Sequence, residues 1–178
     1  FVHLHLHTHY SFLQGLGDPE AFVVRAKELD MPALAITDTD NLHGAFEFYL
    51  LCKKKGIKPI IGVEVFICEQ GQKYDARDAK VYSLILLAKN FNGYKNLIQL
   101  TTKAYLDGNF GSKAQIDFPL LEKYTADTIA LSGDLTSELA QHVVSGKDNK
   151  FLLERIAYYQ KIFGKDHYYL EIGEHPDR

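Results

Sequence analysis

The sequence lacks several features that would each place it in a special class of proteins. No apolar run reaches the roughly 18 residues that would indicate a membrane span. The first residues are rich in histidine, so they do not resemble a secretion signal. Only two cysteines occur, Cys52 and Cys68, and nothing near them has the spacing of a metal or redox motif. We therefore expect a cytoplasmic protein with no membrane contact, in which both thiols are reduced and structural.

The chain also has no excess of positive charge. With 20 basic and 23 acidic residues, the formal net charge is -3 and the pI is about 6.2, unlike a free-standing nucleic-acid-binding protein. One basic run, Lys53 to Lys55 followed by Lys58, departs from this balance. The simpler interpretation is a solvated helix end that the helix dipole favours, and the alternative is contact with phosphate.

Several catalytic motifs are absent as well. The chain has no P-loop, no Rossmann glycine motif and no G-x-S-x-G nucleophile motif. Its composition, 46% hydrophobic and 24% charged, is that of an ordinary globular protein. A chain of 178 residues is long enough to bury about two thirds of its unfolded surface. We therefore expect a single domain over residues 1–178.

Strand and helix signals alternate along the chain. Such a series predicts an α/β fold with parallel strands, either an open doubly wound sheet or a barrel. In both folds, ligand-binding residues gather at the carboxyl ends of the strands. The predicted strands are 1–7, 33–37, 59–66, 81–88, 128–132 and 167–172. One helix is predicted to start near residue 19, and four more are predicted over 45–55, 92–105, 136–144 and 150–163.

Local signals also set the helix boundaries. Asp18 can cap a helix with Pro19 at its first position, and Gly56 can end the second helix. Two polar, glycine-containing stretches, about 69–80 and 107–119, are predicted to be surface loops that could contact other domains. The residues expected to face the core from the helices are Phe22, Ala26, Leu29, Phe46, Tyr49, Leu50, Tyr158, Tyr159 and Phe163.

Four of the eight histidines lie within the first nine residues, along the first predicted strand and just after it. His3, His5, His7 and His9 alternate with other residues, so in a strand all four imidazoles project from one face. Neutral imidazole is a common ligand of Zn, Mn and Fe, and two histidines on one strand can offer two nitrogens to one ion. A single histidine is usually a hydrogen-bonded core residue, but a cluster this dense favours a present or ancestral metal site.

Carboxylates follow several of the predicted strands. Asp38 and Asp40 come after the second strand, Glu64 lies within the third, and Asp134 follows the fifth. Each of them alone is more simply explained as a helix cap or a loop hydrogen bond. Together they would form a ring that suits metal-assisted hydrolysis of a phosphate ester.

Three segments of the chain resemble the PHP (polymerase and histidinol phosphatase) domain. They are FVHLHLHTHYSFLQG, MPALAITDTDNLHGAFEFY and GIKPIIGVEVF. NFNGYKNLIQLTTKAY and the LSGD-containing stretch are similar to the version in the alpha subunit of bacterial DNA polymerase III, a replicative C-family polymerase. The resemblance implies a PHP-type seven-stranded β/α barrel. Because we predict about six strands, we expect an amino-terminal fragment, with a seventh strand and the polymerase domains beyond Arg178.

The resemblance also implies a metal site at named positions. The ligand pattern of the family is matched by His5, His7 and Glu64. It is not matched at Gln14, where metal-binding members have Asp, or at Thr39, where they have the His of a T-D-H motif.

Two further positions depart from the pattern. Ser83 stands where another His is expected, and Asp134 where a Cys or His is usual. Because Gln, Thr and Ser are weak ligands of divalent ions, we expect a vestigial or partial site. Its residues are His5, His7, Glu64 and Asp134, and it would hold at most one residual Zn or Mn ion, with His9, Asp40 or His43 as substitute ligands.

The function implied by the resemblance is a structural and docking module without hydrolase activity, inside a DNA-directed DNA polymerase that acts in DNA replication. No residue here is assigned a catalytic role, and the Mg-dependent nucleotidyltransferase site would lie downstream. The implied partners are the remainder of the alpha subunit and a proofreading exonuclease subunit. DNA would be bound through the parent protein and only weakly by this chain.

Two alternative functions remain open. The chain could be an active metal-dependent 3′-5′ exonuclease or phosphoesterase of the PHP family, and the residues at 14, 39, 83 and 134 argue against this. It could also be an α/β binding domain with a coincidental histidine strand, which predicts no metal near His5.

Overall fold

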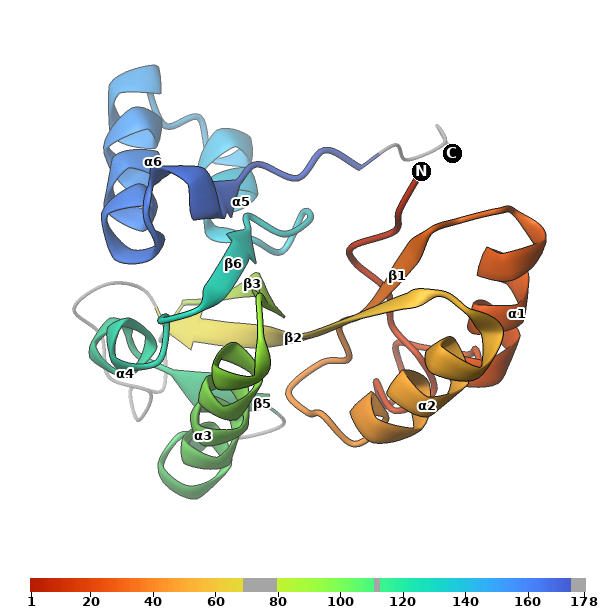
Figure 1. The fold of residues 1–178 in the computed structure, drawn as a ribbon. Coiled ribbons are helices and arrows are strands. Elements are labelled where there is room, and N and C mark those ends of the chain that lie inside the picture. Colours follow the sequence, from red (N-terminus) through yellow and green to blue (C-terminus); the bar gives the residue numbers. More distant parts are fainter. Residues whose placement is uncertain (69–79, 111–112, 174–178) are drawn as a thin grey trace.

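The structure is a computed structural model, and it describes residues 1–68, 80–110 and 113–173. It contains helices and strands of one mixed sheet (Figure 1). The helices are α1 (Pro19–Glu28), α2 (Ala45–Lys55), α3 (Phe91–Asp107), α4 (Phe118–Lys123), α5 (Glu138–Val144) and α6 (Asn149–Phe163), with a 3-10 turn η1 (Lys165–His167). The strands are β1 (Ala33–Ile36), β2 (Lys58–Cys68), β3 (Val81–Ala88), β4 (Asn109–Phe110), β5 (Lys113–Ile116), β6 (Thr128–Leu131) and β7 (Tyr168–Tyr169).

The sheet is mixed rather than parallel. Its order is β4-β5-β2-β3-β6-β7, with β1 also paired to β2. β3 runs antiparallel to both β2 and β6, whereas the pairs β1–β2, β2–β5 and β6–β7 are parallel. The predicted α/β class is confirmed, but the all-parallel prediction is wrong. A parallel connection between β2 and β3 would need a crossover helix. The sequence of the segment between them, residues 69–80, is polar and has no apolar stripe for such a helix, which agrees with the antiparallel pairing.

The expected barrel is not closed within the described residues. The hydrogen-bonded path of the sheet ends at β4 and at β7, and no pairing joins these two strands. The predicted first strand forms no ladder of its own. Residues 1–7 run beside β1, where Ala35 N donates to His3 O at 3.0 Å and Thr37 N donates to Leu6 O at 2.9 Å. The last predicted strand, 167–172, is reduced to β7.

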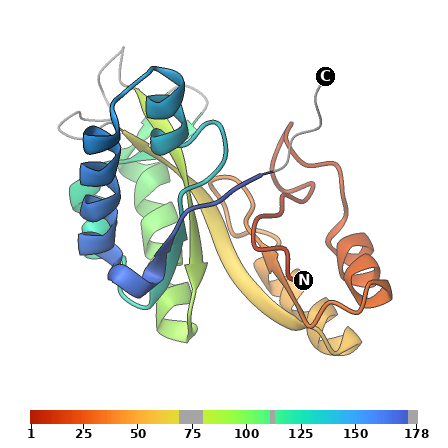
Figure 2. The same cartoon turned by 90° about the horizontal axis from the view of Figure 1, so that it is seen from above.

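β2 is the long strand that connects two lobes of the molecule (Figures 1 and 2). The amino-terminal lobe consists of residues 1–57 and the carboxy-terminal lobe of residues 80–110 and 113–173. Glu64 in the middle of β2 pairs with Thr39 on one edge and with Ile85 on the other. The backbone of Glu64 is therefore fixed from both sides, and its side chain lies where the two lobes meet.

Each lobe has its own hydrophobic core. In the amino-terminal lobe, Val23 of α1 and Phe48 of α2 are fully buried against β1. The larger cluster of the carboxy-terminal lobe packs Leu97 and Leu100 of α3 against β2 and β3. A third cluster joins the lobes across the sheet, and its buried members are Ala35, Ile85, Leu87 and Leu131.

The predicted helix boundaries are largely confirmed, but one predicted face is wrong. Asp18 caps α1 by accepting from Glu20 N at 2.7 Å, and Gly56 ends α2 at a φ of 72°. Phe46, Tyr49 and Leu50, however, are exposed on α2, which buries Phe48 instead. Ala45 and Cys52 are buried on the same face as Phe48. Their small side chains leave room for the helix to pack against the sheet. Leu29 at the end of α1 is exposed as well.

The segment 107–119 is not the surface loop that the sequence predicts. It contains β4 and β5 and the start of α4, and β5 pairs with β2 at Gln115 and Ile116. Ala114 and Ile116 are buried. The strand was missed because four residues with two polar side chains do not differ in composition from a loop. The other predicted loop, 69–80, lies outside the described residues except for Lys80.

Candidate metal centre

Three of the four predicted metal ligands come together where the amino-terminal segment meets β2. His5 and His7 are on this extended segment, and Glu64 is buried in β2 with 4% of its surface exposed. One ligand atom from each residue lies within 4.8 Å of those from the other two. His5 Nε2 is 3.3 Å from His7 Nε2, which in turn is 3.2 Å from Glu64 Oε2.

The charges in this cluster favour a cation. Burial alone would raise the pKa of Glu64, but hydrogen bonds from His7 and Thr39 outweigh it and hold the pKa below its ordinary value. Burial lowers the pKa of His5, but the neighbouring carboxylates, led by Glu171, bring it above its ordinary value. Glu64 is therefore ionised at neutral pH, and His5 lies in a field of negative charge.

Asp134, the fourth predicted ligand, lies outside the three-residue group. It follows β6 on an exposed turn, where its Oδ1 accepts from the backbone nitrogen and the hydroxyl of Thr136, both at 2.9 Å. Burial raises the pKa of Asp134, but these hydrogen bonds and the positive charge of His5 and His7 lower it below its ordinary value. Asp134 thus contributes charge near the cluster, while one of its oxygens holds the turn.

Thr39, one of the unexpected residues, contacts the cluster directly, and Gln14 contacts Thr39. Thr39 Oγ1 lies 2.7 Å from Gln14 Oε1 and 2.9 Å from Glu64 Oε2. A hydroxyl carries one proton, so it can donate to only one of these acceptors at a time. Ser83 is buried and its Oγ lies 2.8 Å from Thr136 Oγ1. All three neutral side chains therefore have protein partners.

The other candidate ligands have separate roles or positions. Asp38 is 2% exposed, and it accepts from Thr8 N at 2.6 Å, Thr8 Oγ1 at 2.8 Å and Ser11 Oγ at 2.6 Å. These bonds fix the loop after the histidine segment. Asp40 is also buried, where its Oδ2 accepts from Ala114 N at 3.3 Å. The remaining histidine candidates, His3, His9 and His43, are exposed and are not members of the three-residue group.

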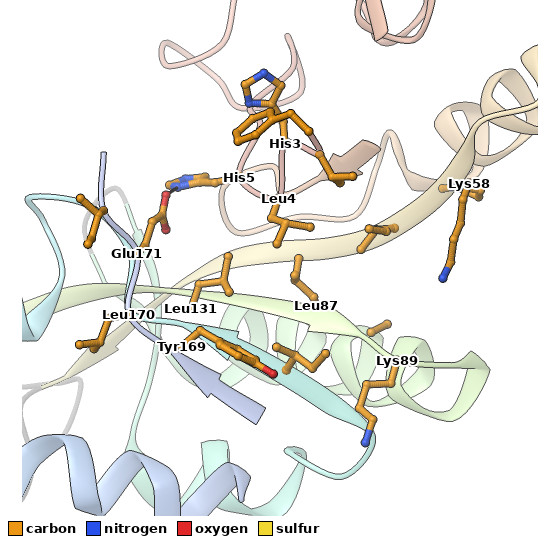
Figure 3. A pocket seen from close by; sticks show the side chains of 17 residues that line it. His3, Leu4, His5, Lys58, Leu87, Lys89, Leu131, Tyr169, Leu170 and Glu171 are labelled. Atoms are coloured by element: carbon orange, nitrogen blue, oxygen red, sulfur yellow. Dashed lines mark hydrogen bonds and ion pairs between the residues drawn. The ribbon is translucent and has the colours of Figure 1, made fainter. Parts of the chain in front are cut away.

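Sequence reasoning missed one residue of this region, Glu171. Its Oε1 lies 2.8 Å from His5 Nδ1, and Figure 3 shows the two side chains pointing toward each other beside an open groove of about 790 Å³. The only signal in the sequence is a charged residue within the apolar run YYLEI. That signal does not identify a partner 166 positions away.

The residues that are present fit one divalent ion. Two imidazole nitrogens and one buried carboxylate oxygen within 4.8 Å of one another are a donor set that suits Zn or Mn. Among residues 1–68, 80–110 and 113–173, no second group of His, Cys, Asp and Glu meets the same criterion. His5, His7 and Glu64 would hold the ion, which when bound would act as a Lewis acid.

Comparison with known proteins places this fold and this histidine segment in a family. Residues 3–175 match the family model described as "PHP domain". The chain therefore belongs to the PHP domain family.

Within the family, the chain is similar to a segment of one bacterial protein. It is 37% identical over 179 residues to DNA polymerase III subunit alpha of Treponema pallidum, and 39% identical over 178 residues to that of Borreliella burgdorferi. The subunit of Thermus aquaticus is 39% identical over 183 residues. Each alignment covers 98% of this chain but 15% of the relative, so the chain spans about 15% of the length of these relatives.

A solved structure supports the fold alone. A protein from Bifidobacterium adolescentis, described as a metal-dependent phosphoesterase, aligns with a TM-score of 0.51 at 12% identity. The alignment covers 96% of this chain and 76% of that chain. In the part of the chain that the structure describes, no helix is both long and apolar enough to cross a membrane.

Proposed function

We propose that this chain is the PHP domain of the alpha subunit of a bacterial DNA polymerase III. In this role it acts in DNA replication as a structural and docking module, and its own hydrolase activity is lost. The similarity of 37 to 39% over 97 to 98% of the chain supports this context, because the relatives share one name. The polymerase chemistry, with its Mg ions, belongs to the parent protein.

The observation that carries the loss of activity is the contact of Thr39 with both Gln14 and Glu64. By family resemblance, positions 14 and 39 should supply an aspartate and a histidine to the metal ions. Here they supply neutral groups, and the hydroxyl of Thr39 can donate to the carboxylate that remains. Two strong ligands are therefore replaced by neutral side chains, of which Thr39 lies within hydrogen-bonding distance of both Gln14 and Glu64.

One residual ion does not restore the family chemistry. Hydrolysis of a phosphodiester by a metal cluster uses ions to stabilise both the attacking and the leaving oxygen. His5, His7 and Glu64, with Asp134 nearby, supply donors for one ion. We therefore infer a partial site of these four residues that binds Zn or Mn without cleaving DNA.

The proposed partners follow from this context. They are the rest of the alpha subunit and a proofreading exonuclease subunit, and the protein acts in the cytoplasm. Phe46 and Tyr49 of α2 and Phe91 at the start of α3 are exposed aromatic residues, which would be covered by further domains of a longer chain. With a net charge of -3, the chain itself neutralises few phosphates and should bind DNA weakly.

The test combines metal content with cleavage in the full-length parent protein. Elemental analysis after dialysis against Mn or Zn should find no more than one ion per PHP domain. Digestion of a primer with a mismatched 3′ end should not depend on these metals. Two or more ions, with cleavage that disappears in His7→Ala, would support the active exonuclease instead. The exposed His9→Ala variant is the matched control.

A further inference from the structure

Glu171 is fixed in place by the end of the sheet. Its backbone nitrogen donates to Ser132 Oγ at 2.9 Å, and Ser132 N donates to Tyr169 O at 2.9 Å. The carboxylate then reaches His5, and the two side chains are 21% and 17% exposed. A contact between largely buried groups on a fixed backbone constrains the imidazole more than a surface ion pair would.

The contact determines which nitrogen of His5 carries a proton. An ionised carboxylate can only accept hydrogen bonds, so Nδ1 of His5 must be the donor to Glu171 Oε1. In the neutral ring, Nε2 then has a free lone pair. This nitrogen is the one that lies 3.3 Å from His7 Nε2 and belongs to the group with Glu64.

The second carboxylate oxygen of Glu171, Oε2, is buried without a hydrogen bond to any residue that the structure describes. Burial also removes the hydration of this atom. A glutamate that only stabilised the fold would more simply be replaced by an apolar residue. Its position behind the imidazole instead matches that of carboxylates that orient metal-binding histidines.

We propose that Glu171 is a positioning residue for a divalent cation, and that it holds His5 with Nε2 directed at the ion. The inference rests on the proposed partial metal site and adds a residue to it. Glu171 contacts the nitrogen of His5 that faces away from the cluster, so it acts through His5 and is not itself a ligand.

The test uses Zn²⁺ as the probe and the chain itself, and reads both affinity and tautomer. Isothermal titration should give an affinity about 10 to 100 times weaker for Glu171→Ala, the usual cost of removing such an orienting partner. Glu171→Gln keeps an acceptor oxygen and should lose less. Glu154→Ala, which removes an exposed carboxylate from α6, should bind as the wild type does. Circular dichroism compares the folding of all variants.

Nitrogen-15 chemical shifts of the imidazoles give the second readout in the metal-free chain. The wild type should have His5 protonated at Nδ1, and Glu171→Ala should lose this preference. A wild-type His5 protonated at Nε2 would overturn the proposal even if the variants failed to fold. Zn²⁺ binding by wild type and Glu171→Ala with equal affinity would overturn the positioning role alone. A wild type that binds no Zn²⁺ would remove the partial metal site and, with it, this role.

Discussion

The two lobes contribute different things to the molecule. The amino-terminal lobe presents His5 and His7 and the loops that carry Gln14 and Thr39, and its hydrophobic core is the smaller one. The carboxy-terminal lobe has the larger core and contributes Glu171, whose Oε1 lies 2.8 Å from His5 Nδ1. The proposed metal site therefore lies mainly on the lobe with the smaller core, and the lobe with the larger core contacts it through Glu171.

Removing a core side chain from the small lobe should have the largest effect. Phe48 is fully buried, and Phe48→Ala should lower the free energy of unfolding by about 3–5 kcal/mol, because it loses apolar burial and leaves a cavity. Urea unfolding followed by circular dichroism measures this. Phe46→Ala, at a position that is 70% exposed on the same helix, should change it by less than about 0.5 kcal/mol. Equal losses for both variants would contradict the assignment of the buried face.

Removing a ligand should have the next largest effect, and it should leave the fold intact. His7→Ala should weaken Zn²⁺ binding more than about 100-fold, beyond the cost of losing an orienting partner, since a donor atom itself is lost. Titration calorimetry measures the affinity. His9→Ala should bind normally, because this exposed residue is outside the cluster. If His9→Ala were the weaker binder, the assignment of the ligands to His5, His7 and Glu64 would be wrong.

The buried carboxyl group of Asp40 should make the stability of the folded chain depend on pH. Burial raises the pKa of Asp40 to about 7. Between about pH 4 and 7 the folded chain keeps a proton that the unfolded chain has released, so the free energy of unfolding falls as the pH rises. At about 1.4 kcal/mol per pKa unit, a shift of about three units sets an upper limit of about 4 kcal/mol on the contribution of Asp40.

Asp40→Asn tests this effect directly. Asparagine cannot ionise, its oxygen can still accept from Ala114 N, and it tolerates the positive φ of 59° at this position. The variant should be more stable than the wild type at pH 8 and about equal to it at pH 4. Urea unfolding of both proteins at the two pH values measures the difference, and a variant no more stable than the wild type at pH 8 would contradict the prediction.

The smallest effect should come from the helix cap of the small lobe. Asp18→Ala removes the acceptor for Glu20 N and should cost about 0.5–2 kcal/mol. Asp18→Asn keeps an acceptor and should cost less. Thermal unfolding of both variants measures the order, and an alanine variant as stable as the wild type would show that the cap contributes nothing.

Local signals predicted the parts of the fold that depend on neighbouring residues. The cap at Asp18, the end of α2 at Gly56 and the strand Val81–Ala88 have the predicted boundaries. The face of α2 was not predictable in this way, because its burial depends on how closely the helix approaches the sheet. Large aromatic residues suggested the wrong face, whereas Ala45 allows the close approach.

The residues of the candidate site also differ in whether local sequence reveals them. Two histidines on one extended segment and a carboxylate, Glu64, on a predicted strand are visible in the sequence, and family resemblance groups them as ligands. Glu171 could not be found in this way, because its role depends on a contact across the whole chain and its own segment reads as an ordinary strand. The mixed sheet was missed for a related reason, since the direction of β3 depends on pairing rather than on its own residues.

The hydrogen bond between His5 and Glu171 has a consequence for synthesis of the protein. During translation His5 is added to the chain 166 residues before its partner. A nascent chain that already contains His5, His7 and Glu64 therefore still lacks the group that selects the tautomer. An ion captured at that stage would be bound without the carboxylate that orients His5, and this contact would form only when the last part of the sheet docks.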